Sequence, residues 1–200
     1  MSERYVVGVD TGHTGALREA DHLLRAVAAE LGLGAEAVGC THHVRDGRRP
    51  HTALSFALPS ERAARAARQW LTDDASSETG APLGVAFGED RHGPDELVAG
   101  AAHAAAEHLA RTGGRAVLYP GAGALTGVLT VARLLEVSAV DRVAVLGSPE
   151  GASPEAKLVT REHVRPEWRD GRLVLAAMPA AGGTLVPFEV PNPTPCCADH

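Results

Sequence analysis

The N-terminal stretch of the chain reads Tyr5-Val6-Val7-Gly8-Val9 and continues directly into Asp10-Thr11-Gly12-His13-Thr14-Gly15. Its first part is a compact apolar run, which is typical of a short buried strand. A helix is predicted at once over residues 16–31, because apolar side chains recur there at helical spacing. A strand that delivers an acid, hydroxyls and glycines to the start of a helix is suited to hold a phosphate or a metal ion.

Strand and helix patterns alternate along the rest of the chain. Strands are predicted over residues 35–44, 52–58, 83–87, 116–119, 143–146, 172–176 and 184–190. Helices are predicted over residues 60–71, with Ser60 as the N-cap, and from Pro94 to about residue 112. A further buried helix is predicted after Gly123, containing Leu125, Val128, Leu129, Ala132 and Leu135. The alternation favours an α/β or mixed α+β fold.

The pattern also predicts how the chain is divided. We expect a main α/β domain over residues 1–147 and a C-terminal strand pair packed on it over residues 148–190. Residues 191–200 are expected to form a flexible tail, because three prolines lead into Cys196 and Cys197.

Composition narrows the class of protein. The apolar content of 44% with only 4% aromatic residues indicates an alanine-rich globular chain. A net charge of −6 argues against a general nucleic-acid binder, which normally has a basic surface. No apolar run reaches the length of a membrane span, and the N-terminus lacks the pattern of a signal peptide, so a cytoplasmic location is the default expectation. Three cysteines do not indicate a disulfide framework.

Several stretches, taken in order, resemble one known family. They are Gly8-Val9-Asp10 with Thr14-Gly15-Ala16-Leu17, Gly39-Cys40-Thr41-His42-His43, residues 49–55, residues 81–86, residues 121–127, and Val164-Arg165-Pro166 with residues 170–175. The set is similar to the TiaS-like family, whose best-known member is the archaeal agmatinylcytidine synthetase that modifies an isoleucine tRNA. The similarity extends over nearly the whole chain.

The resemblance implies a kinase-like α/β domain with a ferredoxin-like companion subdomain. In the synthetase, that domain uses ATP to phosphorylate a cytosine carbonyl oxygen, and an acidic opening motif serves the metal and the phosphates. Asp10 matches the first acid of that motif, whereas Thr11 and His13 stand where the family has carboxylates. Phosphoryl transfer depends on metal and charge placement, so this departure weakens the expectation of magnesium and ATP as cofactors. The chain also ends before the family's oligonucleotide-binding fold and zinc ribbon, so tRNA binding is not expected.

The opening loop supplies the first candidate site residues. We expect Asp10, His13 and His43 to be catalytic, with His13 as the acid/base group because histidine ordinarily titrates near neutral pH. Candidate substrate or phosphate ligands are Thr11, Gly12, Thr14, His51, Gly121 and Gly123. The local alternatives are an Asx-type turn with Thr14 as a helix cap, a solvated turn at His51, and glycines required only for close packing.

A metal site is the second candidate. Cys40 and His42 share one face of a predicted strand, whereas His43 points to the other face. Together with His13 or Asp10, they offer thiolate and imidazole ligands suited to zinc, copper or iron. The alternative is that both histidines simply line a cleft.

Three hypotheses for function follow. The leading one is a small cytoplasmic TiaS-like enzyme that acts on a small molecule, with a nucleotide or phosphate group as the candidate ligand. The second is a metal-dependent enzyme in which histidine and cysteine replaced the missing acids. The third is a non-catalytic regulatory or interaction protein that kept the fold. An oligomer is compatible with all three.

Overall fold

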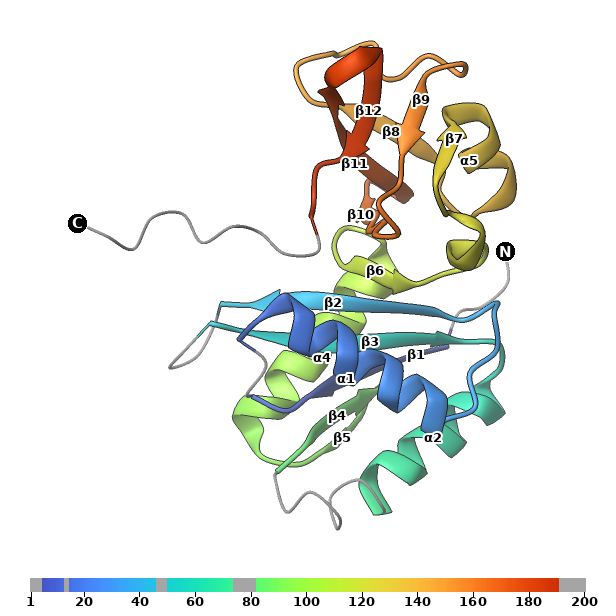
Figure 1. Cartoon of the computed structure of the whole chain (residues 1–200). Coiled ribbons are helices and arrows are strands. Elements are labelled where there is room, and N and C mark those ends of the chain that lie inside the picture. Colours follow the sequence, from blue (N-terminus) through green and yellow to red (C-terminus); the bar gives the residue numbers. More distant parts are fainter. Residues whose placement is uncertain (1–4, 13–14, 46–49, 74–81, 191–200) are drawn as a thin grey trace, which may run out of the picture. The chain divides into compact units, whose positions relative to one another are not determined.

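The computed structural model describes residues 5–12, 15–45, 50–73 and 82–190, and its contacts divide the chain into two units (Figure 1). Unit 1 consists of residues 1–120 and 167–172, and unit 2 consists of residues 121–166 and 173–200. The contacts therefore place a boundary at Pro120, whereas the sequence pattern suggested one main domain over residues 1–147. Each unit is described separately below.

Unit 1 contains an antiparallel sheet. Its strands are β1 (Tyr5–Asp10), β2 (Val38–Val44), β3 (His51–Leu58), β4 (Gly84–Phe87), β5 (Asp90–His92), β6 (Arg115–Leu118) and β10 (Glu167–Arg169). They lie in the order β5-β4-β1-β3-β2-β6-β10, and each of these neighbouring pairs is antiparallel. The antiparallel pairing brings the end of β1 beside the beginning of β3, which decides where the polar residues of the loops meet.

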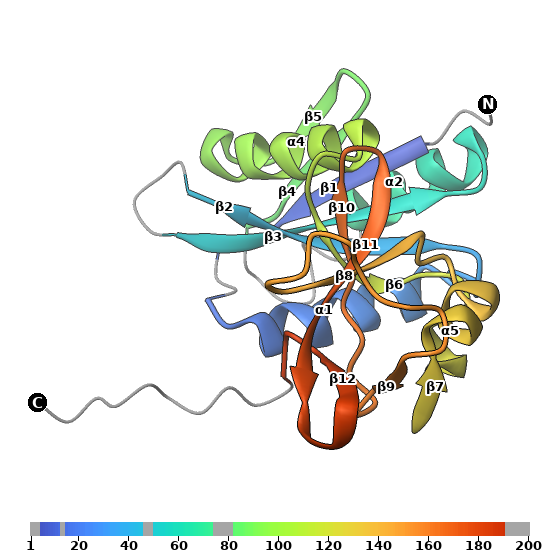
Figure 2. The same ribbon diagram turned by 90° about the horizontal axis from the view of Figure 1, so that it is seen from above.

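Three helices cover the two faces of this sheet. Helices α1 (Leu17–Glu30) and α2 (Glu61–Asp73) contact one face, and α4 (Asp95–Ala110) packs across β1, β3, β4 and β2 on the other. Figure 2 shows α4 and α1 on opposite sides of the strands. The element order in this part of the chain is β1-α1-β2-β3-α2-β4, and the strand order is β4-β1-β3-β2.

The two faces are packed in different ways. Large apolar side chains fill the face under α1 and α2, among them Val7, Val9, Leu24, Leu54, Phe56 and Leu71. The α4 face instead carries small residues, and the helix lies very close to the strands. A Cβ atom built on Gly8 would lie 1.9 Å from the carbonyl oxygen of Ala101, so only glycine permits this approach.

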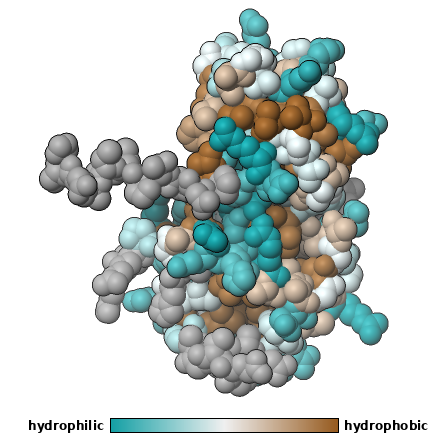
Figure 3. Space-filling model, viewed as in Figure 1, coloured by the Kyte–Doolittle hydropathy of each residue, from teal (hydrophilic) through white to brown (hydrophobic). Residues whose placement is uncertain are grey.

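Unit 2 is smaller and mixed. Its elements are β7 (Val128–Thr130), α5 (Val131–Val137), β8 (Arg142–Val145), β9 (Lys157–Val159), β11 (Arg172–Ala180) and β12 (Thr184–Pro187). Strand β11 pairs antiparallel with β12 and parallel with β8, and β9 joins β12 to β7. Of the four exposed large hydrophobic residues in the described chain, Val128, Leu146 and Phe188 belong to this unit, and Figure 3 shows hydrophobic surface over it.

The mixed α/β fold class is confirmed, and so is the N-cap at Ser60, whose Oγ accepts a hydrogen bond from the backbone N–H of Ala63 at 3.2 Å. The buried helix predicted after Gly123 is wrong. The chain forms strand β7 there, and Val128 is 56% exposed. The helix begins only at Val131, where the side chain of Thr130 caps it. Within the described residues, no helix is both long and apolar enough to cross a membrane.

Candidate functional site

The first candidate site is built on Asp10, the last residue of β1. Its side chain is completely buried, and its Oδ1 accepts a hydrogen bond from the backbone N–H of Gly12 at 2.8 Å. Its Oδ2 lies 2.8 Å from Nε2 of His51, the first residue of β3. The pair follows from the antiparallel pairing of these strands, which places the end of one beside the start of the other.

Helix α4 fixes the carboxylate in place. A Cβ atom at Gly100 would lie only 1.8 Å from Oδ2 of Asp10, so the helix backbone closes directly over the acid. The side chain of His51 is 12% exposed, whereas that of Asp10 is wholly buried. A buried carboxylate that accepts Nε2–H of the ring orients the imidazole and leaves Nδ1 as the basic nitrogen of the neutral form.

A cavity of about 170 Å³ lies beside this pair. Its lining residues are Gly15, His43, Val44, Arg45, Pro50, His51 and Thr52. The cavity thus lies where the loop after β1 meets the end of β2 and the start of β3. Two imidazoles and one guanidinium line it, and the Arg45 guanidinium and the His43 ring provide donors for an anionic or polar ligand.

The second candidate site lies under α4. The metal-ligating atoms of Cys40, His42 and His108 are all within 4.8 Å of one another, and all three residues are buried. Cys40 and His42 alternate with Thr41 on β2 and therefore point to the same face, toward α4, which contributes His108. The predicted pairing of Cys40 with His42 on one face is confirmed, and the cluster can hold a transition metal.

Hydrogen bonds link these histidines into a chain. Nδ1 of His42 lies 2.9 Å from Oε2 of Glu107, and Nε2 of His42 lies 2.7 Å from Oγ of Ser55. The same Ser55 oxygen lies 2.7 Å from Nδ1 of His108. Burial lowers the pKa of His42, and the hydrogen bond from His42 lowers the pKa of Glu107. A neutral His42 ring that donates from Nδ1 to the ionised carboxylate of Glu107 accounts for both pKa shifts.

The Cys40 side chain is completely buried. Burial raises the pKa of the Cys40 thiol to about 12, while a hydrogen bond from Trp168 and the charge of Arg115 act in the opposite direction. Trp168 in turn lies under the guanidinium of Arg111, which is 4.9 Å from the centre of the indole ring. The thiol is therefore protonated at neutral pH unless a cation replaces the proton.

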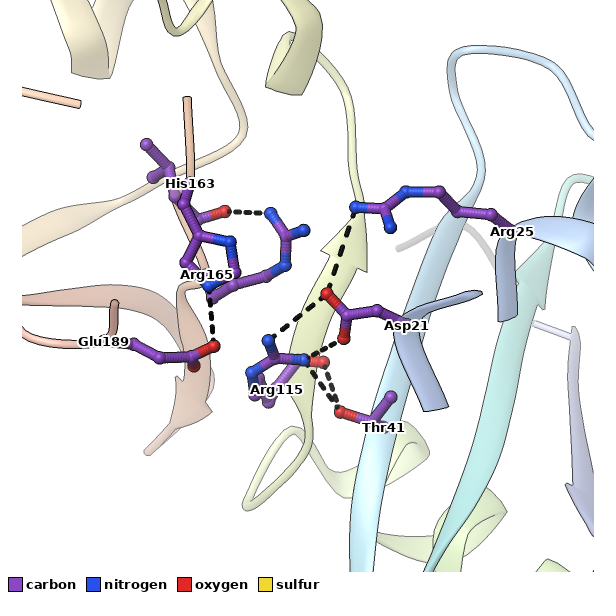
Figure 4. Close-up of polar contacts among 8 residues, drawn as sticks. Asp21, Arg25, Thr41, Arg115, His163, Arg165 and Glu189 are labelled. Atoms are coloured by element: carbon purple, nitrogen blue, oxygen red, sulfur yellow. Dashed lines mark hydrogen bonds and ion pairs between the residues drawn. The ribbon is translucent and has the colours of Figure 1, made fainter. Parts of the chain in front are cut away.

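On the opposite face of the sheet lies a buried ion pair. Figure 4 shows Arg115 of β6 bonded to Asp21 of α1 and to Thr41 of β2. The side chains of Arg115 and Asp21 are each 7% exposed. Figure 4 also shows a separate pair within unit 2, in which Nε2 of His163 lies 2.8 Å from Oε1 of Glu189. The Arg115 pair ties α1 to the sheet and belongs to the scaffold.

The structure brings together part of the predicted site. Asp10, Gly12 and His51 meet through hydrogen bonds, and His43 lines the cavity with His51. The Asx-type contact at Gly12, which was the local alternative, is present alongside the pair with His51. Thr11 is half-buried in the same loop.

Other predicted residues lie elsewhere. His13 and Thr14 are outside the described residues, as are Cys196 and Cys197. Gly121 and Gly123 belong to unit 2, whereas the other candidates belong to unit 1. A Cβ atom at Gly121 would lie 1.9 Å from the carbonyl oxygen of Val137, which supports the close-packing interpretation of this glycine.

Sequence reasoning missed Ser55, Glu107 and His108 as neighbours of the cysteine and histidine pair. A signal for Ser55 exists, because it is a polar residue among apolar ones on the inward face of β3. His108 lies four residues after Ala104 on the small-residue face of α4, which indicates burial. Neither signal shows that Ser55 and His108 lie beside β2, because that conclusion requires knowledge of the strand order.

Comparison with known proteins gives no relative: no family model, no curated protein and no solved structure matches this chain.

Proposed function

We propose that the chain is an enzyme acting on a small molecule, in which His51, oriented by Asp10, transfers protons to or from a ligand in the neighbouring cavity. The observation that carries this proposal is the 2.8 Å contact between Nε2 of His51 and the fully buried Oδ2 of Asp10. A fixed imidazole at the edge of a cavity meets the geometric requirement for general acid–base catalysis.

The lining supports a small anionic ligand. Arg45 offers a guanidinium and His43 offers a ring N–H group, while the basic Nδ1 of His51 can accept a proton from the ligand. The volume of about 170 Å³ is below the range of about 300–1,000 Å³ that is usual for drug-sized ligands. A phosphate or carboxylate group on a small substrate suits this space and charge, which agrees with the phosphate-binding role implied by the resemblance to TiaS-like proteins.

The same geometry argues against magnesium–ATP chemistry at Asp10. One carboxylate oxygen accepts the Gly12 N–H, and the other is paired with His51 beneath the α4 backbone. Magnesium prefers carboxylates that share its coordination sphere with several waters, and this carboxylate is completely buried. We therefore favour proton transfer over phosphoryl transfer as the chemistry of this site.

The experiment is a substrate screen with matched variants. The purified protein is incubated with small phosphorylated and carboxylated metabolites, and turnover is followed by NMR. His51→Gln should lower turnover of any substrate found by about 10²–10⁴-fold while substrate binding changes little, because general acid–base catalysis contributes that much. His22→Gln is the matched control, since His22 is an exposed histidine on α1. Undiminished turnover in His51→Gln, or a wild-type protein that binds and converts no member of the panel, would contradict the proposal.

The metal-dependent alternative has its own observation, the cluster of Cys40, His42 and His108. These residues are only 0–2% exposed, and none of them lines the cavity. A catalytic metal needs an open coordination position that the substrate can reach. The cluster therefore suits a structural ion better than a catalytic one.

A further inference from the structure

We propose that Cys40, His42 and His108 bind a divalent transition-metal ion, for which zinc is the best match, and that the ion fastens helix α4 to strand β2. This site is independent of the proposed catalytic pair. It lies under the C-terminal part of the same helix and uses none of the residues that line the cavity.

Helix α4 packs against the sheet mainly through small side chains, so hydrophobic contacts alone hold it weakly. Its buried residues before His108 are Gly100, Ala101, Ala104 and Ala105. Hydrophobic stabilisation is roughly proportional to the apolar area buried, about 25 cal/mol per Å², and these side chains contribute little area. The opposite face of the sheet, by contrast, is held by large apolar side chains such as Phe56 and Leu24. Metal–ligand bonds between the helix and the strand would supply the stabilisation that the small side chains do not provide.

The donor set fits zinc. One thiolate and two imidazoles supply three of the four ligands of a tetrahedral zinc ion, with bonds of about 2.0–2.3 Å. Ligand atoms around a tetrahedral ion with such bonds lie roughly 3.5 Å apart. The three ligand atoms are already within 4.8 Å of one another, so metal binding requires them to approach by no more than roughly 1.3 Å.

The surroundings already resemble those of a metal site. A ligating histidine usually donates its second ring N–H to a carboxylate, which fixes the ring and makes it a better ligand. Glu107 has this relation to His42, at 2.9 Å from Nδ1. Nε2 then carries the lone pair and faces Ser55. Glu107 is thus a positioning residue that fixes the tautomer needed for binding.

In the metal-free protein, a hydrogen-bonded arrangement around Ser55 takes the place of metal coordination. The Ser55 hydroxyl bridges the two imidazoles at 2.7 Å from each, so the buried nitrogens concerned have partners before the ion arrives. Binding breaks the bond from Ser55 to Nε2 of His42. It also deprotonates the Cys40 thiol, forms a bond from sulfur to metal and releases one proton to solvent. The unit can therefore fold first and bind the ion afterwards.

Cobalt titration of the full chain tests the proposal, with Co²⁺ as a spectroscopic substitute for zinc. The background carries Cys196→Ser and Cys197→Ser, so that Cys40 is the remaining thiol. We expect one Co²⁺ to bind, with a sulfur-to-cobalt charge-transfer band that zinc abolishes by displacement. The band should vanish in Cys40→Ala. Absence of the band in the background protein, or its persistence in Cys40→Ala, would overturn the site.

Glu107→Gln tests the positioning role without removing a ligand. It should weaken cobalt binding by about 10–100-fold, as loss of an outer carboxylate partner does, while the charge-transfer band at saturation keeps its shape. Glu30→Gln is the control, because Glu30 is an exposed acid at the end of α1. Equal weakening in both variants would contradict a specific role for Glu107.

Because core substitutions can prevent folding, one measurement uses no core variant. X-ray absorption of the zinc-loaded background protein should show one sulfur and at least two imidazole nitrogens around the ion. A coordination shell that contains only nitrogen and oxygen, or no imidazole, would overturn the proposal regardless of how the variants behave.

Discussion

The carboxylate of Asp10 and the imidazole of His51 are 41 residues apart in the chain and 2.8 Å apart in the folded unit. The contact exists because β1 and β3 run antiparallel, and because α4 lies close enough to keep the carboxylate away from water. Small residues on α4 are therefore part of the proposed active site, although they carry no reactive group.

Gly100→Ala tests this dependence. The added Cβ would lie 1.8 Å from Oδ2 of Asp10, so either the carboxylate or the helix must move. We expect a loss of about 1–3 kcal/mol in the free energy of unfolding, which is typical of overpacking, together with loss of the pair with His51. Urea denaturation measures the first effect. Gly34→Ala is the control, since no atom lies within 4 Å of the added carbon there. A Gly100→Ala protein as stable as that control would contradict the packing described.

The buried ion pair between Asp21 and Arg115 gives a second prediction. Asp21→Asn should destabilise the protein by about 3–5 kcal/mol, because it leaves the guanidinium buried without a countercharge. The double variant Asp21→Leu/Arg115→Met should recover much of that loss. Denaturant unfolding of the two single variants, Asp21→Leu and Arg115→Met, and of the double variant measures the coupling.

The control for that cycle is the exposed pair Glu61 and Arg65 on α2, whose coupling should be much smaller because solvent screens both charges. Equal coupling in the exposed and the buried pair would show that the Asp21 contact is not buried as described.

The histidine chain predicts how stability depends on pH in chelator-treated protein. Burial lowers the pKa of His42 from its ordinary value of 6.5, and the bond with His42 lowers that of Glu107 from 4.5. For each group, the unfolded state binds more protons than the folded state once the pH falls below the ordinary pKa of that group. Stability should therefore decrease below about pH 6.5 because of His42, and further below about pH 4.5 because of Glu107.

Thermal unfolding between pH 7.5 and about pH 5 measures this effect for the histidine. His42→Gln should have a shallower slope than wild type over that range, whereas His22→Gln, which removes an exposed histidine, should keep the wild-type slope. If His42→Gln kept the full slope, His42 would not be the group that titrates.

Much of the fold could be predicted from local sequence. The helical repeat over residues 16–31 corresponds to α1, and the alternation over residues 52–58 corresponds to β3. The prediction of a helix at Val128 was wrong because a short apolar segment is equally compatible with a helix and a strand. Only the pairing of β7 with β9 decides between them, and that contact is made by residues far apart in the chain.

The candidate site was predictable in its parts but not in its partners. The loop position of Asp10 and the shared face of Cys40 and His42 follow from strand geometry. The partners His51 and His108 depend on an antiparallel order and on the side of the sheet that α4 covers. A local pattern carries neither piece of information.

The most direct test of the central claim is long-range ¹H–¹⁵N NMR of the ring nitrogens of His51, assigned by comparison with His51→Gln. In wild-type protein, the neutral ring should carry its proton on Nε2, because that nitrogen faces the buried carboxylate of Asp10. Inorganic phosphate, used as a probe of the cavity, should shift the His51 signals in wild type, and Asp10→Asn should abolish the Nε2–H preference. A ring protonated on Nδ1 in wild type, or signals that respond to neither phosphate nor Asp10→Asn, would contradict the proposed acid–base site.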